Sequence, residues 1–279
     1  MNSFIVLNIT QSYIEIGKGG YYEPEYKYEI PNPPLRDYSE LEMSRFFKKC
    51  FREGLQMATK DIDIILCEEI LCSLLEKQKY CVILLRMLQC SSVTFIPSPI
   101  MHCLSSGTRT GLVINIDYCM ATCTPIYDLR IMDHFLKSTS RAKKWLLSRG
   151  SSEASEDGLH SIFISDDMEV PIVDADEKSI NSLIKEVLRI VPIDTRSSIQ
   201  SNLIISGISI SPTLIAAIEK DTEAQIIKCL GSWQGASLYS SILYRSDIKD
   251  NMLRITRESF LERDQKIPDW YNNRFEASV

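Results

Sequence analysis

The 279-residue sequence lacks any long run of apolar residues. No stretch approaches the roughly 18 residues that a membrane-spanning helix needs, and the start, Met1-Asn2-Ser3, lacks the basic region of a signal peptide. The sequence also lacks a basic excess, because its net charge is −6 and its pI about 5.3. A nucleic-acid-binding surface usually needs such an excess. These absences predict a globular protein that binds neither membrane nor nucleic acid.

Metal-binding motifs are lacking as well. The three histidines, His102, His134 and His160, are far apart, and the nine cysteines contain no CxxC pair. Most of the cysteines lie in apolar runs, which is typical of buried, reduced thiols. Reduced thiols indicate a reducing compartment, the cytosol or the nucleus.

A short phrase occurs twice in the sequence. Val6–Ile9 reads VLNI and Val113–Ile116 reads VINI. Each phrase lies in an apolar run typical of a buried strand, and each is followed by a second β-rich stretch, Ser12–Ile16 or Ala121–Tyr127. Two related hairpins predict a molecule of two lobes that face each other across a cleft, with a polar Asn at the end of each first strand.

The remaining chain alternates helical and strand patterns, which predicts a mixed, largely parallel α/β fold. We expect strands over 62–66, 93–96 and 203–205, and helices over 40–57, 77–88, 99–106, 132–147, 178–191, 212–219 and 236–244. The Pro-rich segment 21–37 is expected to be an extended connection. The polar, acidic segment 148–158 is expected to be a disordered loop.

Five motifs, in their order along the chain, resemble the actin family. They are Ser105–Gly111 (family S-G-R-T-T-G), Pro125–Asp128 (P-I-Y-E), Leu203–Gly207 (V-L-S-G-G), Trp233–Ser237 (W-I-G-G-S) and Ile255–Phe260 (I-S-K-x-E-Y). The resemblance spans nearly the whole chain. It implies an α/β, actin-like fold, in which two ribonuclease-H-like lobes surround a cleft.

The resemblance also implies a domain division and two deletions. The first lobe would comprise residues 1–128 together with 233–279, and the second lobe residues 129–232. The chain is much shorter than actin. Between residues 24 and 40 there is room only for a short connection where the family inserts its second subdomain, and between 128 and 178 the fourth subdomain is strongly reduced.

The family's nucleotide site is degenerate in this sequence. In the family, both hairpin tips carry aspartates and glycine-rich turns that hold phosphates and the water shell of a metal ion. Here Asn8 and Asn115 replace the aspartates, neither turn contains glycine, Glu15 stands at the position of a lysine, and Ile208 follows Gly207. We therefore expect no enzymatic activity, no catalytic residue, no metal and no cofactor. A vestigial ATP or ADP would be held only weakly at Asn8, Asn115 and Gly207.

One carboxylate remains in the second turn. Asp117 is interpreted either as a shifted metal ligand or as a capped or solvated turn residue, and the second interpretation is favoured. An ATP-dependent actin-fold enzyme, such as a sugar kinase or chaperone ATPase, is disfavoured because the phosphate loops are missing.

The retained parts imply a role in a filament. The second and fourth subdomains form one joining face of an actin protomer, and the first and third form the other. A protomer that keeps only the second of these faces caps a filament. Such shortened proteins resemble the pointed-end actin-related subunit of dynactin, fungal type. That role implies a cytoplasmic, cytoskeletal location. It also implies as partners the filament-forming actin-related protein and the other pointed-end subunits. The alternative is an actin-related scaffold subunit of a nuclear chromatin-remodelling complex.

The resemblance places a protein interface at Leu104, Tyr239 and Ile242. In actins these positions line an apolar cleft that receives the clasping loop of the neighbouring protomer, and central aromatic and aliphatic residues usually dominate interface energy. In the competing interpretation all three are ordinary core residues.

Overall fold

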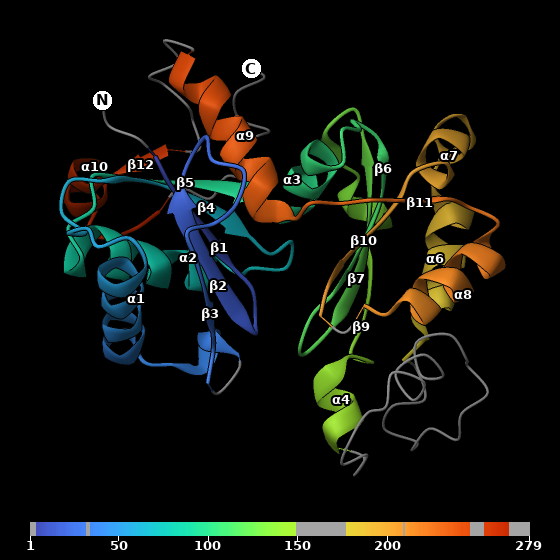
Figure 1. Ribbon diagram of the computed structural model, residues 1–279, viewed down its shortest axis with the longest axis horizontal. Coiled ribbons are helices and arrows are strands. Elements are labelled where there is room, and N and C mark those ends of the chain that lie inside the picture. The colour runs from blue at the N-terminus through green and yellow to red at the C-terminus, as the bar shows by residue number, and fades with distance from the viewer. Residues whose placement is uncertain (1–3, 32–33, 149–176, 209, 246–253, 268–279) are drawn as a thin grey trace. The chain divides into compact units, whose positions relative to one another are not determined.

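The computed structural model describes residues 4–31, 34–148, 177–208, 210–245 and 254–267 (Figure 1). The chain divides into two compact units. The first unit comprises residues 1–101 and 232–279, and the second comprises residues 102–231. Among the described residues, no helix is both long enough and apolar enough to cross a bilayer.

A six-stranded sheet organises the first unit, in the order β12-β5-β4-β1-β2-β3. β1 pairs antiparallel with β2 and parallel with β4, β2 pairs antiparallel with β3, and β4 pairs parallel with β5. The strands are β1 (Ile5–Ile9), β2 (Tyr13–Lys18), β3 (Tyr26–Glu29), β4 (Asp63–Glu68), β5 (Ser92–Pro97) and β12 (Arg254–Thr256).

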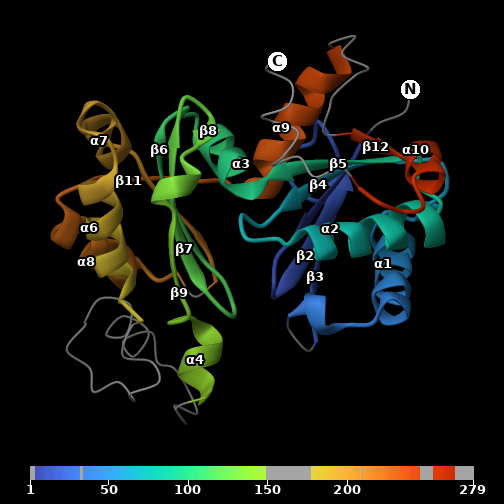
Figure 2. The same cartoon turned by 180° about the vertical axis from the view of Figure 1, so that it is seen from behind.

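Helices cover both faces of this sheet. On one face, α9 (Ser232–Arg245) packs with the buried Trp233, whose Nε1 donates to the carbonyl of Val6 at 3.1 Å. The other face is covered by α1 (Glu40–Gly54), α2 (Leu74–Cys81), the π-helix η2 (Val82–Met87) and α10 (Arg257–Glu262). Figure 2 shows these helices with the ribbon turned by 180° from Figure 1. A short 3-10 turn, η1 (Leu35–Asp37), precedes α1.

Local sequence explains the largest of these helices. A capping box between Ser39 and Glu42 fixes the start of α1. Met43, Phe47 and Phe51 then recur at a spacing of four and are buried against the sheet. The predicted helix over 40–57 is therefore confirmed from Glu40 to Gly54, and its last three residues lie beyond the helix.

The second unit repeats the topology of the first. Its main sheet has the order β11-β10-β6-β7-β8, with β9 paired to β7. β6 pairs antiparallel with β7 and parallel with β10, and β10 pairs parallel with β11. The strands are β6 (Gly111–Ile116), β7 (Ala121–Tyr127), β8 (Arg130–Ile131), β9 (Lys137–Thr139), β10 (Leu203–Gly207) and β11 (Ile226–Ile227). Both sheets thus follow one plan, in which the first strand lies at the centre between an antiparallel and a parallel neighbour. The predicted α/β fold with two related lobes is confirmed.

Helices pack on the β6–β10 sheet through a separate apolar core. They are η3 (Asp133–Phe135), α4 (Lys143–Ser148), α6 (Ile180–Ile190), α7 (Ile193–Gln200) and α8 (Pro212–Thr222), and α3 (Ser98–Ser105) leads from the first unit into the second. Leu183, Ile184 and Val187 of α6 face this core, as the helical periodicity over 178–191 predicts.

The predicted domain boundary at residue 128 is wrong, since the chain passes from the first unit to the second between residues 101 and 102. The reason is strand pairing. β6 and β7, which were expected in the first lobe, form their ladders with β10 and β9. The second hairpin is therefore the centre of the second unit, as β1–β2 is the centre of the first.

Three further expectations concern single segments. The single helix expected over 132–147 is wrong, because its first half forms η3 and β9 beside β7 and only α4 is helical. The extended segment 21–37 contains β3 and the short turn η1. The loop expected over 148–158 lies outside the described residues, except for Ser148 at the end of α4.

Candidate functional site

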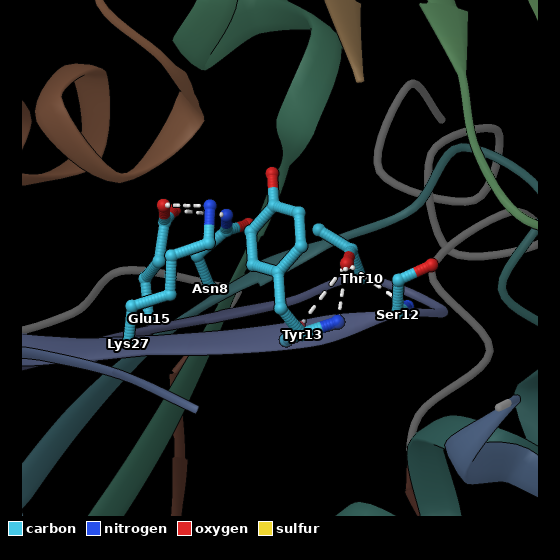
Figure 3. A network of polar contacts seen from close by, with 6 residues as sticks. All are labelled: Asn8, Thr10, Ser12, Tyr13, Glu15 and Lys27. Atoms are coloured by element: carbon cyan, nitrogen blue, oxygen red, sulfur yellow. Dashed lines mark hydrogen bonds and ion pairs between the residues drawn. The ribbon is translucent and has the colours of Figure 1, made fainter. Parts of the chain in front are cut away.

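The turn between β1 and β2 is closed by its own side chain. The Thr10 hydroxyl oxygen accepts hydrogen bonds from the backbone N–H groups of Ser12 at 3.2 Å and Tyr13 at 3.0 Å. The Thr10 hydroxyl also donates to the carbonyl of Tyr13 at 3.1 Å. In a phosphate-binding loop such N–H groups point at the ligand. Here a hydroxyl already occupies them (Figure 3).

An ion pair lies beside this turn. Asn8, which is 1% exposed, donates from Nδ2 to Glu15 Oε2 at 2.9 Å, and the two residues are direct partners across the ladder. The Lys27 ammonium binds Glu15 Oε1 at 3.2 Å and lies 3.5 Å from the centre of the Tyr13 ring. Figure 3 shows the Lys27 and Glu15 side chains on the same side of the ribbon as Asn8 and Tyr13. These four residues are called the hairpin polar cluster below.

The hairpin polar cluster changes the interpretation of Glu15. By sequence alone its carboxylate would repel a phosphate. In the structure its negative charge is neutralised by Lys27 of the adjacent strand β3. The resemblance to actins has a lysine where Glu15 stands, whereas here the nearby lysine is Lys27 of β3, which is paired with the Glu15 carboxylate. The cluster satisfies its charges without a ligand.

The β6–β7 turn has the same backbone pattern. Asp117 N–H donates to the carbonyl of Met120 at 3.0 Å, as Thr10 N–H donates to that of Tyr13. Asp117 is 4% exposed, and its Oδ1 accepts the N–H of Tyr118 at 2.7 Å. It is therefore a buried, capped turn residue. No cluster of three or more His, Cys, Asp or Glu side chains suited to a metal ion occurs among the described residues.

Asn115 occupies the position in β6 that Asn8 occupies in β1. It is half-buried and lies opposite Thr122 of β7 and Ser206 of β10. Each Asn is the last residue but one of its strand. The repeated sequence phrase thus marks equivalent positions in the two units.

Gly207 has a packing role of its own. Its φ is +121°, and a β-carbon at this position would lie 1.8 Å from the carbonyl oxygen of Ile116. Next to it, the N–H of Ile208 donates to the same oxygen at 2.8 Å. The close approach of β10 to the end of β6 therefore requires glycine whether or not a nucleotide is bound.

The predicted interface residues have different surroundings. On α9, Ile242 is 56% exposed and Tyr239 is half-buried. Leu238, one helical turn before Ile242, is 53% exposed and was not predicted. Leu104 is half-buried on α3 and belongs to the second unit. The interpretation of Ile242 as a core residue is wrong. We call Leu238, Tyr239 and Ile242 the α9 face.

The loop after β2 is hydrogen-bonded to α9 at Ser237, the residue before Leu238. Gly20 N–H donates to Ser237 Oγ at 2.9 Å, and Ser237 Oγ donates to the carbonyl of Tyr21 at 2.6 Å. Tyr21 and its neighbour Tyr22 are 59% and 69% exposed. The loop after β2 is thereby fixed to the helix and presents two tyrosines to solvent.

The connection between β3 and α1 takes only residues 30–39. Ile30 is buried at its start and Leu35 near its middle, and Ser39 caps α1. Lys79 of α2 donates to the carbonyls of Arg36 and Tyr38 and holds η1 against the unit. No helix or strand other than η1 is inserted among the described residues of this connection.

No protein-family model matches the chain. A curated protein, Actin-like protein ARP10 of Saccharomyces cerevisiae, is 28% identical over 284 residues. The similarity covers 100% of this chain and 98% of the relative, so the two chains have nearly the same length. The short connection between β3 and α1 therefore lies within a similarity that runs from end to end.

Proposed function

We propose that this chain, an actin-related protein, is a non-catalytic structural subunit that caps the pointed end of the dynactin minifilament. In that position it would support dynein-dependent transport along microtubules. The full-length similarity to Actin-like protein ARP10 supports the family part of the proposal. The short connection 30–39 is the observation that carries the capping part.

The physical argument concerns the two faces of a protomer. A filament grows through head-to-tail contacts, and every added subunit must offer both faces. The actin resemblance places a second subdomain, with its clasping loop, between β3 and α1. This chain closes that connection with buried Ile30 and Leu35 and offers no such loop among its described residues. It would join a filament end and then leave nothing for the next subunit to bind.

The α9 face would make the filament contact. Leu238 and Ile242 are one turn apart and more than half exposed, so together they present an apolar surface on one side of the helix. Tyr239 between them adds an aromatic side chain, the kind that often carries much of the energy of an interface. The filament-forming actin-related protein of dynactin would supply the segment that covers them.

The proposed subunit works without nucleotide. Thr10 binds the turn N–H groups of β1–β2, and Lys27 neutralises Glu15. The two features remove the donors and the net positive charge that a triphosphate would use. The hairpin polar cluster would thus take the structural place of the ligand.

End binding tests the proposal directly. Purified chain is added to filaments of the dynactin actin-related protein, and pointed-end growth and end occupancy are followed by single-filament fluorescence microscopy. We expect one bound chain per filament at a single end, arrest of growth there, and no filaments of the chain alone. Binding along filament sides, or self-assembly of the purified chain, would refute the capping role.

A paired substitution tests the α9 face. Leu238→Asp with Ile242→Asp should abolish end binding while circular dichroism stays unchanged, because both side chains are exposed. The matched control is Leu261→Asp on α10, an equally apolar residue that is 49% exposed on the same unit. Equal loss of end binding in the control would show that α9 is not the contact.

A further inference from the structure

A half-buried thiol lies among polar groups in the second unit. The Cys229 sulfur is 3.3 Å from Nδ1 of His102 and 3.2 Å from the hydroxyl oxygen of Ser105. The backbone N–H of Gly231 donates to the same sulfur at 3.3 Å, and the carbonyl oxygen of His102 lies 3.7 Å from it. We call His102, Ser105, Cys229 and Gly231 the thiol cluster.

The thiol cluster joins the two ends of the second unit. His102 and Ser105 lie in α3, and Cys229 and Gly231 follow β11. The chain enters the unit at His102 and leaves it after Gly231. The hydroxyls of Ser105 and Ser106 donate to the His102 carbonyl at 3.0 and 2.8 Å and hold the end of the helix. The sulfur of Cys229 is therefore bound to the first residues of the unit.

The surroundings of Cys229 differ from those of the buried cysteines. Burial raises the pKa of each of the thiols of Cys50, Cys90 and Cys123 to about 12, as expected for sulfur in an apolar core. Burial, and then the negative charge of a Cys229 thiolate, raises the pKa of Cys103 to about 12. Cys103 thus stays protonated near a second thiol, Cys229, that is half-buried and has polar neighbours.

Three hydrogen-bond donors of the cluster converge on one sulfur. The Gly231 N–H already donates to it, and the Ser105 hydroxyl donates to it when its hydrogen turns from the His102 carbonyl. Burial lowers the pKa of His102 to about 4, so the ring is neutral at neutral pH and carries one N–H. With that hydrogen on Nδ1, the ring is the third donor. The cluster is thus arranged to hold the negative charge that a thiol develops when it reacts.

We propose that Cys229 is a site of reversible modification by small disulfides, the class to which oxidised glutathione belongs. The thiol proton passes to water, and the Cys229 thiolate attacks one sulfur of the reagent. A new S–S bond forms, the S–S bond of the reagent breaks, and the released thiolate takes up a proton. One thiol and one disulfide become another thiol and a mixed disulfide, so no further oxidant is needed. The proposal does not depend on filament capping.

The modification separates α3 from the segment that follows β11. A sulfur that carries a second, bulky group loses its contacts with His102 and Ser105, and with them the connection between the two ends of the unit. We expect the modified chain to melt about 2–4 °C lower than the unmodified chain. Dithiothreitol, which reduces the mixed disulfide, should restore the midpoint.

The reaction rate of each cysteine in the folded full chain tests the proposal. The chain is treated with dithiodipyridine, a small disulfide, the reaction is stopped at timed intervals, and peptide mass spectrometry locates the added group. Cys72 and Cys119 are the matched controls, because they too are neither buried nor fully exposed. We expect Cys229 to react at least about tenfold faster than either control. Oxidised glutathione should show the same order.

Substitutions at two neighbouring serines separate the donors from simple access. Ser105→Ala removes a donor but opens space around the sulfur, and we expect the reaction of Cys229 to slow by about fivefold. Ser105→Thr keeps the hydroxyl and should retain the rate. Ser106→Ala is the control, because the Ser106 hydroxyl donates to the same carbonyl of His102 as Ser105 does. That variant should also retain the rate. Circular dichroism shows whether each variant is folded.

Three outcomes would overturn the proposal. The first is a Cys229 that reacts no faster than Cys72 and Cys119. The second is an equal or faster reaction in Ser105→Ala, which would mean that exposure alone governs the rate. The third is a product without the added group, in which Cys229 is joined to Cys103.

Discussion

Asn8 of β1 donates a hydrogen bond from Nδ2 to Oε2 of Glu15, its partner across the β1–β2 ladder, at 2.9 Å. The same carboxylate binds the Lys27 ammonium at 3.2 Å. One carboxylate thus satisfies a buried amide and a lysine beside the turn that the resemblance to actins assigns to phosphate binding. Because Glu15 has two partners and Lys27 has one carboxylate, the two residues differ in their expected contribution to stability.

Removal of Glu15 should therefore cost more than removal of Lys27. Glu15→Ala leaves the buried Asn8 amide without this acceptor and should lower the free energy of unfolding by about 1–3 kcal/mol. Lys27→Met loses the ion pair with Glu15 and the contact with the Tyr13 ring, but the lysine is half-exposed, so the cost should be about 1 kcal/mol. Urea denaturation followed by circular dichroism measures both.

Lys49→Met is the control for the lysine substitution. Lys49 forms a 4.0 Å pair with Glu53, and both side chains are well exposed on α1. Its replacement should change stability by less than about 0.5 kcal/mol. Equal effects of Lys27→Met, Lys49→Met and Glu15→Ala would show that the hairpin polar cluster stabilises nothing.

The sequence predicts one half of this cluster. The repeated VLNI and VINI phrases place Asn8 and Asn115 at equivalent strand ends, and the structure has them there. Lys27 was not predicted, because its strand β3 lies in a segment dominated by prolines and glutamates. The alternation in Tyr26-Lys27-Tyr28-Glu29 is a strand signal, but only the β2–β3 register brings Lys27 opposite Glu15.

The error over residues 132–147 has a similar cause. Met132 and Phe135 have helical spacing in the sequence, yet both pack against the core of the second unit from outside regular helix. The pairing of Lys137–Thr139 with β7 determines the path of the chain there. Such pairing joins residues distant in sequence, so local periodicity does not report it.

Gly207 should not tolerate even the smallest side chain. Gly207→Ala would place a β-carbon against the Ile116 carbonyl and impose a φ that side chains rarely adopt. We expect a loss of more than about 3 kcal/mol in the free energy of unfolding. The control is Gly107→Ala, where φ is also positive, at +70°, but nothing lies within 4 Å of the added carbon. That variant should lose about 1 kcal/mol. Comparable losses in thermal denaturation would contradict the packing role of Gly207.

His102 gives the second unit a dependence on pH. Burial lowers the pKa of His102 from 6.5 to about 4, and its Nδ1 lies 3.3 Å from the Cys229 sulfur. Between these two pKa values the unfolded chain binds a proton that the folded chain does not. Stability should therefore rise with pH from about 4 to 6.5 and change no further through this group above that range. The whole effect is on the order of 3 kcal/mol.

Denaturation across this pH range measures the effect through two variants. In His102→Asn the slope between pH 4 and 6.5 should be smaller than in the unsubstituted chain, whatever the overall loss of stability. His134→Asn replaces an exposed histidine and should leave the slope unchanged. An unaltered slope in the His102 variant would assign the pH dependence to other groups.

Thermal denaturation with and without millimolar Mg-ATP tests the proposed independence from nucleotide. We expect no shift of the midpoint, since a ligand stabilises a protein only when it binds the folded state preferentially. A shift of several degrees would contradict the expectation. Two features could exclude the phosphates, the carboxylate of Glu15 and the turn N–H groups that Thr10 already binds. The double substitution Glu15→Lys with Lys27→Glu separates them, because it places a lysine where actins have one and retains an ion pair. Thr10 would still bind the N–H groups of Ser12 and Tyr13, so this variant should also show no shift. A shift in the exchanged variant alone would mean that charge, and not the closed turn, excludes the phosphates.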